Sequence, residues 1–157
     1  MSYQIDLPQS ERLTMTLNNL PEQKLAALKA YTSALQKHFG NQLLDILLFG
    51  SQARGEARAG SDIDLLVILD HPDAAGLSYA RGYGFDIWLD YDVQLSIRAM
   101  SLQQWQALAA MRSLFYQNVR RDGISLLPQP VVVARHLADP EQADDFKMDI
   151  IKASSVT

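Results

Sequence analysis

The sequence predicts an α/β domain in which helices pack on a small mixed β-sheet. Three apolar runs of strand length and composition support this prediction: residues 43–49, 62–69 and 93–99. Segments with helical spacing separate and follow these runs, which is typical of a sheet covered by helices. The chain has 157 residues, of which 48% are hydrophobic, and this is enough for one domain with a sizeable core.

The overall composition excludes several function classes. A net charge of −4 provides no basic surface for duplex nucleic acid, so we expect no direct duplex partner. The absence of cysteine excludes disulfide scaffolding, thiol nucleophiles and thiolate zinc sites. Residues 1–10 lack the basic and apolar pattern of a secretion signal, and no apolar run is long enough to cross a bilayer. We therefore expect a cytoplasmic protein without a membrane partner.

A helix is expected before the first strand. Pro21 suits the first turn of a helix, where its missing N–H is not needed. Leu28, Leu35 and Phe39 continue with helical spacing, and Gly40 supplies the stop.

Three further helices are expected after the second strand. Asp73 is a candidate N-cap for a helix over residues 74–89, although its two internal glycines weaken that prediction. Ser101 and Gln104 have the spacing of a capping box at the start of the next helix. The last helix is expected to begin at Ser113 and to end at Gly123.

These elements divide the chain into three parts. Residues 1–20 are polar and weakly patterned, and we expect them to form an N-terminal arm that lies on the fold or on a partner. Residues 21–127 hold the predicted domain. The break at Pro128 and Pro130 introduces a tail over residues 128–157, either a short partner-docking helix or a flexible terminus that orders only on contact.

The strand over residues 43–49 ends at Gly50 and Ser51. Glycine lets the backbone approach a phosphate closely, and the serine hydroxyl can donate to it. Successive amide groups around such a turn form a concavity that binds anions. A Gly-Ser pair alone is usually only a turn, so its neighbours decide its meaning.

Asp62 and Asp64 are two residues apart on the next strand, so strand periodicity places both carboxylates on one face. Two like charges at this spacing repel each other unless a cation lies between them. Magnesium is the expected cation, because it takes one or two protein carboxylates and completes its shell with phosphates and water. The ordered combination of Gly-Ser turn and Asp-x-Asp strand is far more specific than either motif alone.

The residues Phe49-Gly50-Ser51-Gln52-Ala53-Arg54-Gly55, followed by Gly60-Ser61-Asp62-Ile63-Asp64-Leu65-Leu66-Val67, resemble the signature of the DNA polymerase β nucleotidyltransferase superfamily, and within it the small bacterial minimal nucleotidyltransferases. The resemblance implies a polymerase β-like fold. It implies that Asp62 and Asp64 are catalytic and bind Mg²⁺, with ATP as the substrate. The nucleotide-binding residues that it implies are Gly50, Ser51, Arg54 and Ser61.

Arg54 has two possible roles. It can contact phosphate, or it can fold the spacer back by pairing with Asp62 or Glu56, and we favour the second role.

The chain departs from the family pattern at one position. Enzymes of this family normally carry a third carboxylate in the middle of the next strand, and counting back from Ser101 places that position at Ser96. Asp92 precedes the strand and lies roughly 13 Å from Ser96 along an ideal strand. We keep Asp92 as the candidate third catalytic carboxylate, with a turn aspartate as its alternative role.

The resemblance also implies an acceptor. Small nucleotidyltransferases of this type are commonly antitoxins that transfer AMP to a tyrosine of a HEPN-domain ribonuclease toxin, which predicts a hetero-oligomer. One alternative is a degenerate antitoxin that neutralises its toxin by binding alone. A further alternative is modification of an aminoglycoside, for which the short segment after Leu127 leaves little room.

Overall fold

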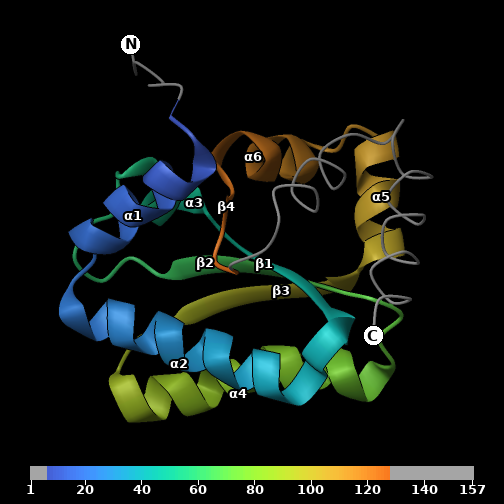
Figure 1. The fold of residues 1–157 in the computed structure, drawn as a ribbon, viewed down its shortest axis with the longest axis horizontal. Coiled ribbons are helices and arrows are strands. Elements are labelled where there is room, and N and C mark those ends of the chain that lie inside the picture. Colours follow the sequence, from blue (N-terminus) through green and yellow to red (C-terminus); the bar gives the residue numbers. More distant parts are fainter. Residues whose placement is uncertain (1–6, 128–157) are drawn as a thin grey trace.

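The computed structural model describes residues 7–127, which form a four-stranded mixed sheet with helices on both faces (Figure 1). The strand order is β3-β2-β1-β4. Strand β1 pairs antiparallel with β2 and β4, and β2 pairs parallel with β3. The predicted small mixed sheet is thus confirmed. The strands are β1 (Leu43–Phe49), β2 (Ile63–Leu69), β3 (Leu95–Ser101) and β4 (Ile124–Ser125).

The helices agree with the predicted segments, with additions. Helix α4 ends two residues later than the predicted residue 89, and the sequence patterns did not define α1, α3 or β4. The described helices are α1 (Gln9–Asn19), α2 (Glu22–Phe39), α3 (Gly50–Arg54), α4 (Ala74–Tyr91), α5 (Leu102–Ala110) and α6 (Leu114–Asp122), with a 3-10 turn η1 (Gly40–Gln42) after α2.

The predicted caps are present where the sequence places them. The Asp73 carboxylate accepts a hydrogen bond from the Gly76 amide at the start of α4. Ser101 and Gln104 form a reciprocal capping box at the start of α5. The Ser113 hydroxyl accepts from the third residue of α6. Each bond satisfies an amide that the helix itself leaves unpaired, which fixes where the helix begins.

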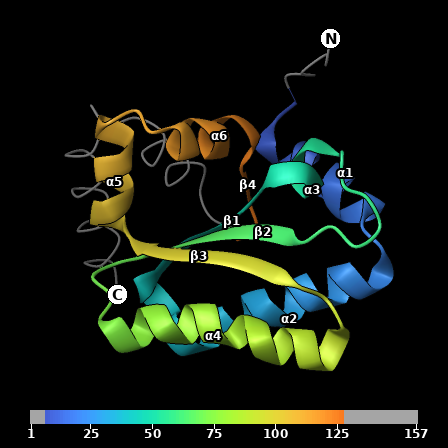
Figure 2. The ribbon, with the colours of Figure 1, turned by 180° about the vertical axis from the view of Figure 1, so that it is seen from behind.

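Side chains that alternate along β2 separate the core into two layers. Ile63, Leu65 and Val67 face one apolar cluster with α2 and α4, which lie side by side below the sheet in Figure 1. Leu66 and Ile68 face a second cluster with α5 and α6 on the opposite side, as the reverse view in Figure 2 also shows. Asp64 follows the same alternation, so its carboxylate lies on the α5 and α6 side of the sheet.

Helix α4 lies very close to β3 at Gly84. A Cβ atom at this position would lie 2.6 Å from Cδ1 of Ile97, so the absent side chain permits the contact. The helix interior loses some helical propensity at this glycine. The absent side chain allows α4 to cross closely over β3, and this contact fixes the position of the helix relative to the strand.

Two sequence-level expectations concern regions at the ends of the chain. Helix α1 lies within the arm expected over residues 1–20, and it contacts β4 and the end of α6. The tail expected over residues 128–157 lies outside the described residues. Within residues 7–127, no helix combines the length and apolar character needed to cross a bilayer.

One carboxyl group is buried inside the sheet. Asp45 on β1 is 1% exposed, and burial raises its pKa to about 6. Its Oδ1 accepts hydrogen bonds from the Ser125 hydroxyl at 2.5 Å and from the Ile46 amide at 2.8 Å. The hydroxyl bond ties the short strand β4 to β1.

We expect Asp45→Asn to reduce the pH dependence of folding. Because the folded-state pKa is raised, the stability contributed by protonated Asp45 is fully present below about pH 4. This contribution, about 3 kcal/mol, is lost as the pH rises to about 6. The amide keeps the Oδ1 acceptor without the charge, so the variant should be more stable than wild type at pH 7. Urea unfolding between pH 4 and 7 measures this, and parallel curves for the two proteins would contradict it.

Candidate active site

The Gly50 turn lies directly against the Asp64 side chain. Gly50 directly follows β1 and opens α3 with φ of +73°, a conformation that favours glycine. A Cβ atom at this position would lie 2.2 Å from Oδ2 of Asp64, which is far inside van der Waals contact. Glycine is therefore required twice, for the turn and for the approach of the carboxylate. Ser51 follows in the first turn of α3.

Ser96 lies opposite Asp64 on the neighbouring parallel strand. Its side chain hydrogen bonds with the Asp64 carboxylate. The pKa of Asp64 is raised chiefly by burial and then by the nearby charge of Asp62, while Ser96, Arg54 and Arg98 oppose the rise. A partly buried carboxylate whose pKa is raised further by a neighbouring carboxylate forms a site that a cation would stabilise.

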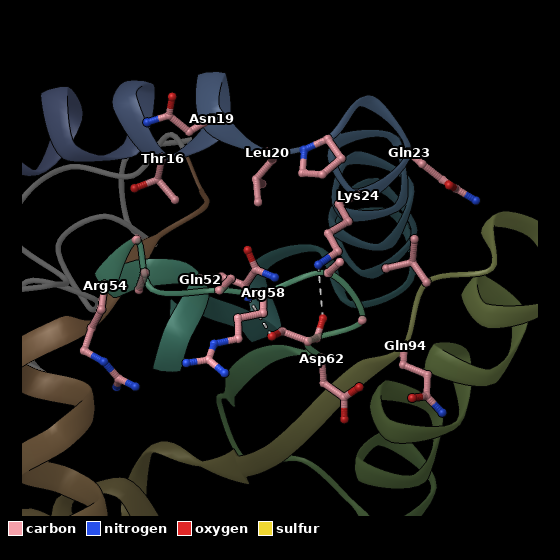
Figure 3. Close-up of a pocket in the computed structure, with 18 of the residues that line it drawn as sticks. Thr16, Asn19, Leu20, Gln23, Lys24, Gln52, Arg54, Arg58, Asp62 and Gln94 are labelled. Carbon is pink, nitrogen blue, oxygen red and sulfur yellow. Dashed lines mark hydrogen bonds between the residues drawn. The ribbon is translucent and has the colours of Figure 1, made fainter.

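A cleft of about 1090 Å³ adjoins Asp62, the first of the two carboxylates (Figure 3). Its walls come from α1, the start of α2, α3 with the spacer that follows it, the end of α4 and the residues just before β3. Asp62 and Asp92 both line it. Gln52 is buried in its wall, and Nε2 of this residue has no hydrogen-bond partner within residues 7–127. The cleft is large enough for a nucleotide-sized molecule.

The spacer between α3 and β2 is fixed at its second end by α2. Nζ of Lys24 donates to the Ser61 carbonyl at 3.1 Å, and the Arg58 amide donates to the Ser61 hydroxyl at 2.9 Å (Figure 3). Figure 3 shows the Arg58 side chain projecting between Gln52 and Asp62. The cleft is therefore lined by cations above Asp62, which suits an anionic ligand.

Arg54 links the spacer to α6. Its Nε donates to Glu56 at 2.9 Å, as the favoured sequence interpretation predicts, and its Nη1 donates to Asp122 at 3.3 Å. Asp122 is only 5% exposed. The pKa of Asp122 is lowered first by Arg121 and then by Arg54. Pairing with Asp62 is not observed, so Arg54 supports α3 through Glu56 and Asp122.

Asp122 was missed at the level of sequence, although one signal was available. An acidic residue in the last turn of a helix opposes the helix dipole, so its presence there points to a specific partner. Arg121 beside it donates to both carboxylate oxygens at 2.9 Å. Arg121 thus has a specific pairing role in addition to its favourable place at the helix end.

The structure sorts the residues predicted for the site into two groups. Gly50 and Asp64 lie in contact, with Ser51 next to Gly50. A second group lines the cleft, comprising Arg54, Ser61, Asp62 and Asp92. Asp92 caps the C-terminus of α4 with φ of +54°, and it is not among the charges that shift the pKa of Asp64. The position expected for the third carboxylate is occupied by Ser96 beside Asp64.

A magnesium ion fits the donor set formed by Asp62 and Asp64. The pKa of Asp64 is raised chiefly by burial and then by the charge of Asp62, and Arg54 and Arg98 offset this rise only in part. Because Gly50 has no side chain, one carboxylate oxygen of Asp64 lies directly against the backbone, in the space that a Cβ atom would fill. Within residues 7–127 no group of three acidic, histidine or cysteine residues has metal-ligand geometry. The donor set therefore suits an ion that takes further ligands from a substrate.

We expect Gly50→Ala to be more damaging than Gly55→Ala. Both glycines have positive φ, but only a Cβ at Gly50 meets another group, since Gly55 faces open space. The added collision with Asp64 should lower the free energy of unfolding by about 1–3 kcal/mol beyond the Gly55→Ala change. Denaturant unfolding measures the difference, and equal losses would show that the contact with Asp64 is unimportant.

We expect Ser96→Ala to raise the pKa of Asp64 further, because the hydroxyl hydrogen bond favours the charged carboxylate. Ionisation of Asp64 should then be completed at a higher pH than in the wild type. NMR titration of the side-chain carboxyl carbons measures the shift, with Ser78→Ala on the exposed side of α4 as the control. An unchanged Asp64 titration would remove Ser96 from the site.

Comparison with known proteins identifies the family. A model of the nucleotidyltransferase domain matches residues 28–110, which include β1, α3, β2, α4 and β3. A candidate protein adenylyltransferase of Methanocaldococcus jannaschii is 41% identical over 44 residues, or 28% of this chain and 44% of that protein. The chain thus spans less than half the length of this curated relative.

Two solved structures have a similar general layout. One is a crystal structure of a toxin–antitoxin with AMP-PNP, 19% identical, with a TM-score of 0.47 over 82% of this chain and 98% of that chain. The other contains a tri-AMPylated Shewanella oneidensis HEPN toxin in complex with an MNT antitoxin, 18% identical, with a TM-score of 0.45 over 86% and 99%. From the family match, the chain belongs to the nucleotidyltransferase domain family.

Proposed function

We propose that this nucleotidyltransferase transfers AMP from ATP to a hydroxyl group in a magnesium-dependent reaction. The observation that carries the proposal is the contact between the Gly50 turn and the Asp64 carboxylate, with the charge of Asp62 close enough to affect Asp64. A phosphate-binding turn and a metal-binding carboxylate pair are thereby joined in one site. The adenylyltransferase relative supports adenine as the base.

Each predicted residue has a role in this proposal. The Gly50 and Ser51 turn holds the triphosphate, while Arg54 keeps α3 in place through Glu56 and Asp122. Ser61 shapes the spacer beside the cleft. Asp62 and Asp64 hold Mg²⁺, which supplies neutralisation of the triphosphate charge. Positioning and electrostatics are the main contributions that a protein makes to such a transfer.

The transfer exchanges one phosphorus–oxygen bond for another. The acceptor oxygen bonds to the α-phosphorus, and the bond from that phosphorus to the oxygen bridging the β-phosphate breaks. Pyrophosphate leaves with the electron pair of the broken bond, and the acceptor proton passes to a base. Asp92 lines the same cleft as Asp62, so we propose it as this base, since the Ser96 hydroxyl is not basic at neutral pH.

For the acceptor we propose a tyrosine of a HEPN-domain ribonuclease toxin, which makes this chain its antitoxin. The motif resemblance to minimal nucleotidyltransferases supports this acceptor. The cleft also suits an incoming aromatic side chain, because Met15 and Trp88 line it and are half exposed.

Neutralisation by binding alone is the second candidate function. The observation that favours it is the serine at position 96, where enzymes of this family normally carry a third carboxylate. Under this proposal the chain covers its toxin without modifying it. The two functions make opposite predictions for the Asp-x-Asp pair.

We expect Asp62→Asn with Asp64→Asn to abolish magnesium-dependent ATP binding and AMP transfer. Removing both carboxylates removes the metal ligands while keeping the side-chain shape. Calorimetry measures ATP binding, and intact mass measures modification of a HEPN toxin co-expressed with each variant. Glu11→Gln with Glu22→Gln is the control, because it removes the same charge at exposed positions.

The outcomes separate the two functions. AMP on the toxin with wild type and with the control, but not with the double mutant, supports the transferase. Full neutralisation by the double mutant, with no added mass in any sample, would instead establish binding alone.

A further inference from the structure

The outer face of α4 carries an apolar stripe. Phe85, Trp88 and Leu89 are 57%, 43% and 62% exposed, and their spacing of three and four residues places them on one side of the helix. The rings of Phe85 and Trp88 are in contact, with centroids 5.6 Å apart. Single exposed apolar residues are ordinary, but a contiguous stripe indicates an interaction surface. We call these three residues the α4 stripe.

The stripe is continuous with the candidate active site. Trp88 belongs to the stripe and also lines the cleft that contains Asp62. Met15 of α1, which is 51% exposed, lines the same cleft. A molecule seated on the stripe therefore has an apolar path into the cleft.

The position of the stripe relative to β3 is also fixed. The close contact of Gly84 with Ile97 holds α4 against the strand that carries Ser96. A partner bound to the outer face of α4 is consequently placed in a defined position relative to the site.

Acidic side chains outnumber basic ones around the stripe, where Arg81 is exposed one turn before Phe85. Asp86 and Asp90 are exposed on α4, and Asp92 is exposed at its end. A partner that offers basic residues beside apolar ones would satisfy both parts of this surface. Electrostatic attraction of this kind favours the choice and orientation of a partner more than raw affinity.

We propose that the α4 stripe is the docking surface for the acceptor protein, through a segment that presents apolar side chains flanked by Lys and Arg. This inference rests on the proposed transfer to a protein hydroxyl, and it adds where the acceptor binds and by what chemistry. The segment packs on Phe85 and Leu89, and the modified side chain enters the cleft past Trp88.

Charge argues against two other candidate occupants of the stripe. Residues 128–157 of this chain contain five acidic and three basic residues, so they do not complement an acidic surface. A second copy of the chain has a net charge of −4 and repels this surface for the same reason.

The test uses the full chain and two synthetic peptides. The first is an amphipathic helix of leucine and lysine followed by a short flexible segment with one tyrosine, and the second replaces each lysine with glutamate. Leu89→Glu disrupts the stripe without altering a residue of the cleft. Leu114→Glu is the matched control, because Leu114 is 72% exposed at the start of α6, away from α4.

Fluorescence anisotropy measures peptide binding, calorimetry measures ATP binding, and intact mass measures AMP transfer to the peptide tyrosine. We expect the lysine peptide to bind wild type and Leu114→Glu, and Leu89→Glu to weaken that binding by at least about tenfold. ATP binding should be the same in all three proteins. The glutamate peptide should not bind.

Other results would overturn the docking surface. Equal binding of the two peptides, equal binding by Leu89→Glu, or no peptide binding by wild type would each do so while ATP binding persists. A wild-type dimer that Leu89→Glu dissociates would assign the stripe to a second copy. If acrylamide does not quench the fluorescence of Trp88 in the monomer, the stripe is covered by the chain's own terminus. If the wild type does not bind ATP, the result would instead count against the proposed function.

Discussion

The candidate site depends on the contact between the backbone at Gly50 and the carboxylate of Asp64. This contact requires that β1 ends in a turn with positive φ and that β2 runs antiparallel beside it. β3 joins the other side of β2, and Ser96 on it supplies a hydrogen bond to the same carboxylate. Three segments that are separate in sequence thus fix the position of the Asp64 side chain. A shift of any one of them would move it.

A second constraint holds the short helix α3 over the sheet. A helix of five residues has little stability of its own, so its position must come from contacts with the rest of the fold. The charge contacts of Arg54 with Glu56 and with the buried Asp122 provide this anchoring. α1 adds to it, because Arg12 donates to the Asp122 carbonyl. The outer helices therefore support the phosphate turn at a distance.

Sequence reasoning was most reliable where one local signal decides the structure. Strands β1 and β2 and the caps at Asp73 and Ser101 were predicted because apolar runs and capping residues act over a few positions, whereas β3 begins and ends two residues later than the expected 93–99. The place of Ser96 was predicted because the following helix start fixed the strand. The ion pair of Arg54 with Asp122 was not predictable, since the two residues are 68 positions apart and their pairing exists only in the folded chain. Helix α1 was equally difficult to predict, because its residues are mostly polar and none of them is buried.

The order of the strands has a consequence for the sheet itself. Within residues 7–127, β3 lies at one edge and pairs only with β2, so one row of its backbone groups has no strand partner. Exposed edges of this kind can add a strand from another molecule, which is a common route to aggregation. Arg98 is exposed on this strand, and a charged side chain at an edge opposes such pairing. The strand that brings Ser96 to the carboxylates is thus also the strand at which the solubility of the fold needs protection.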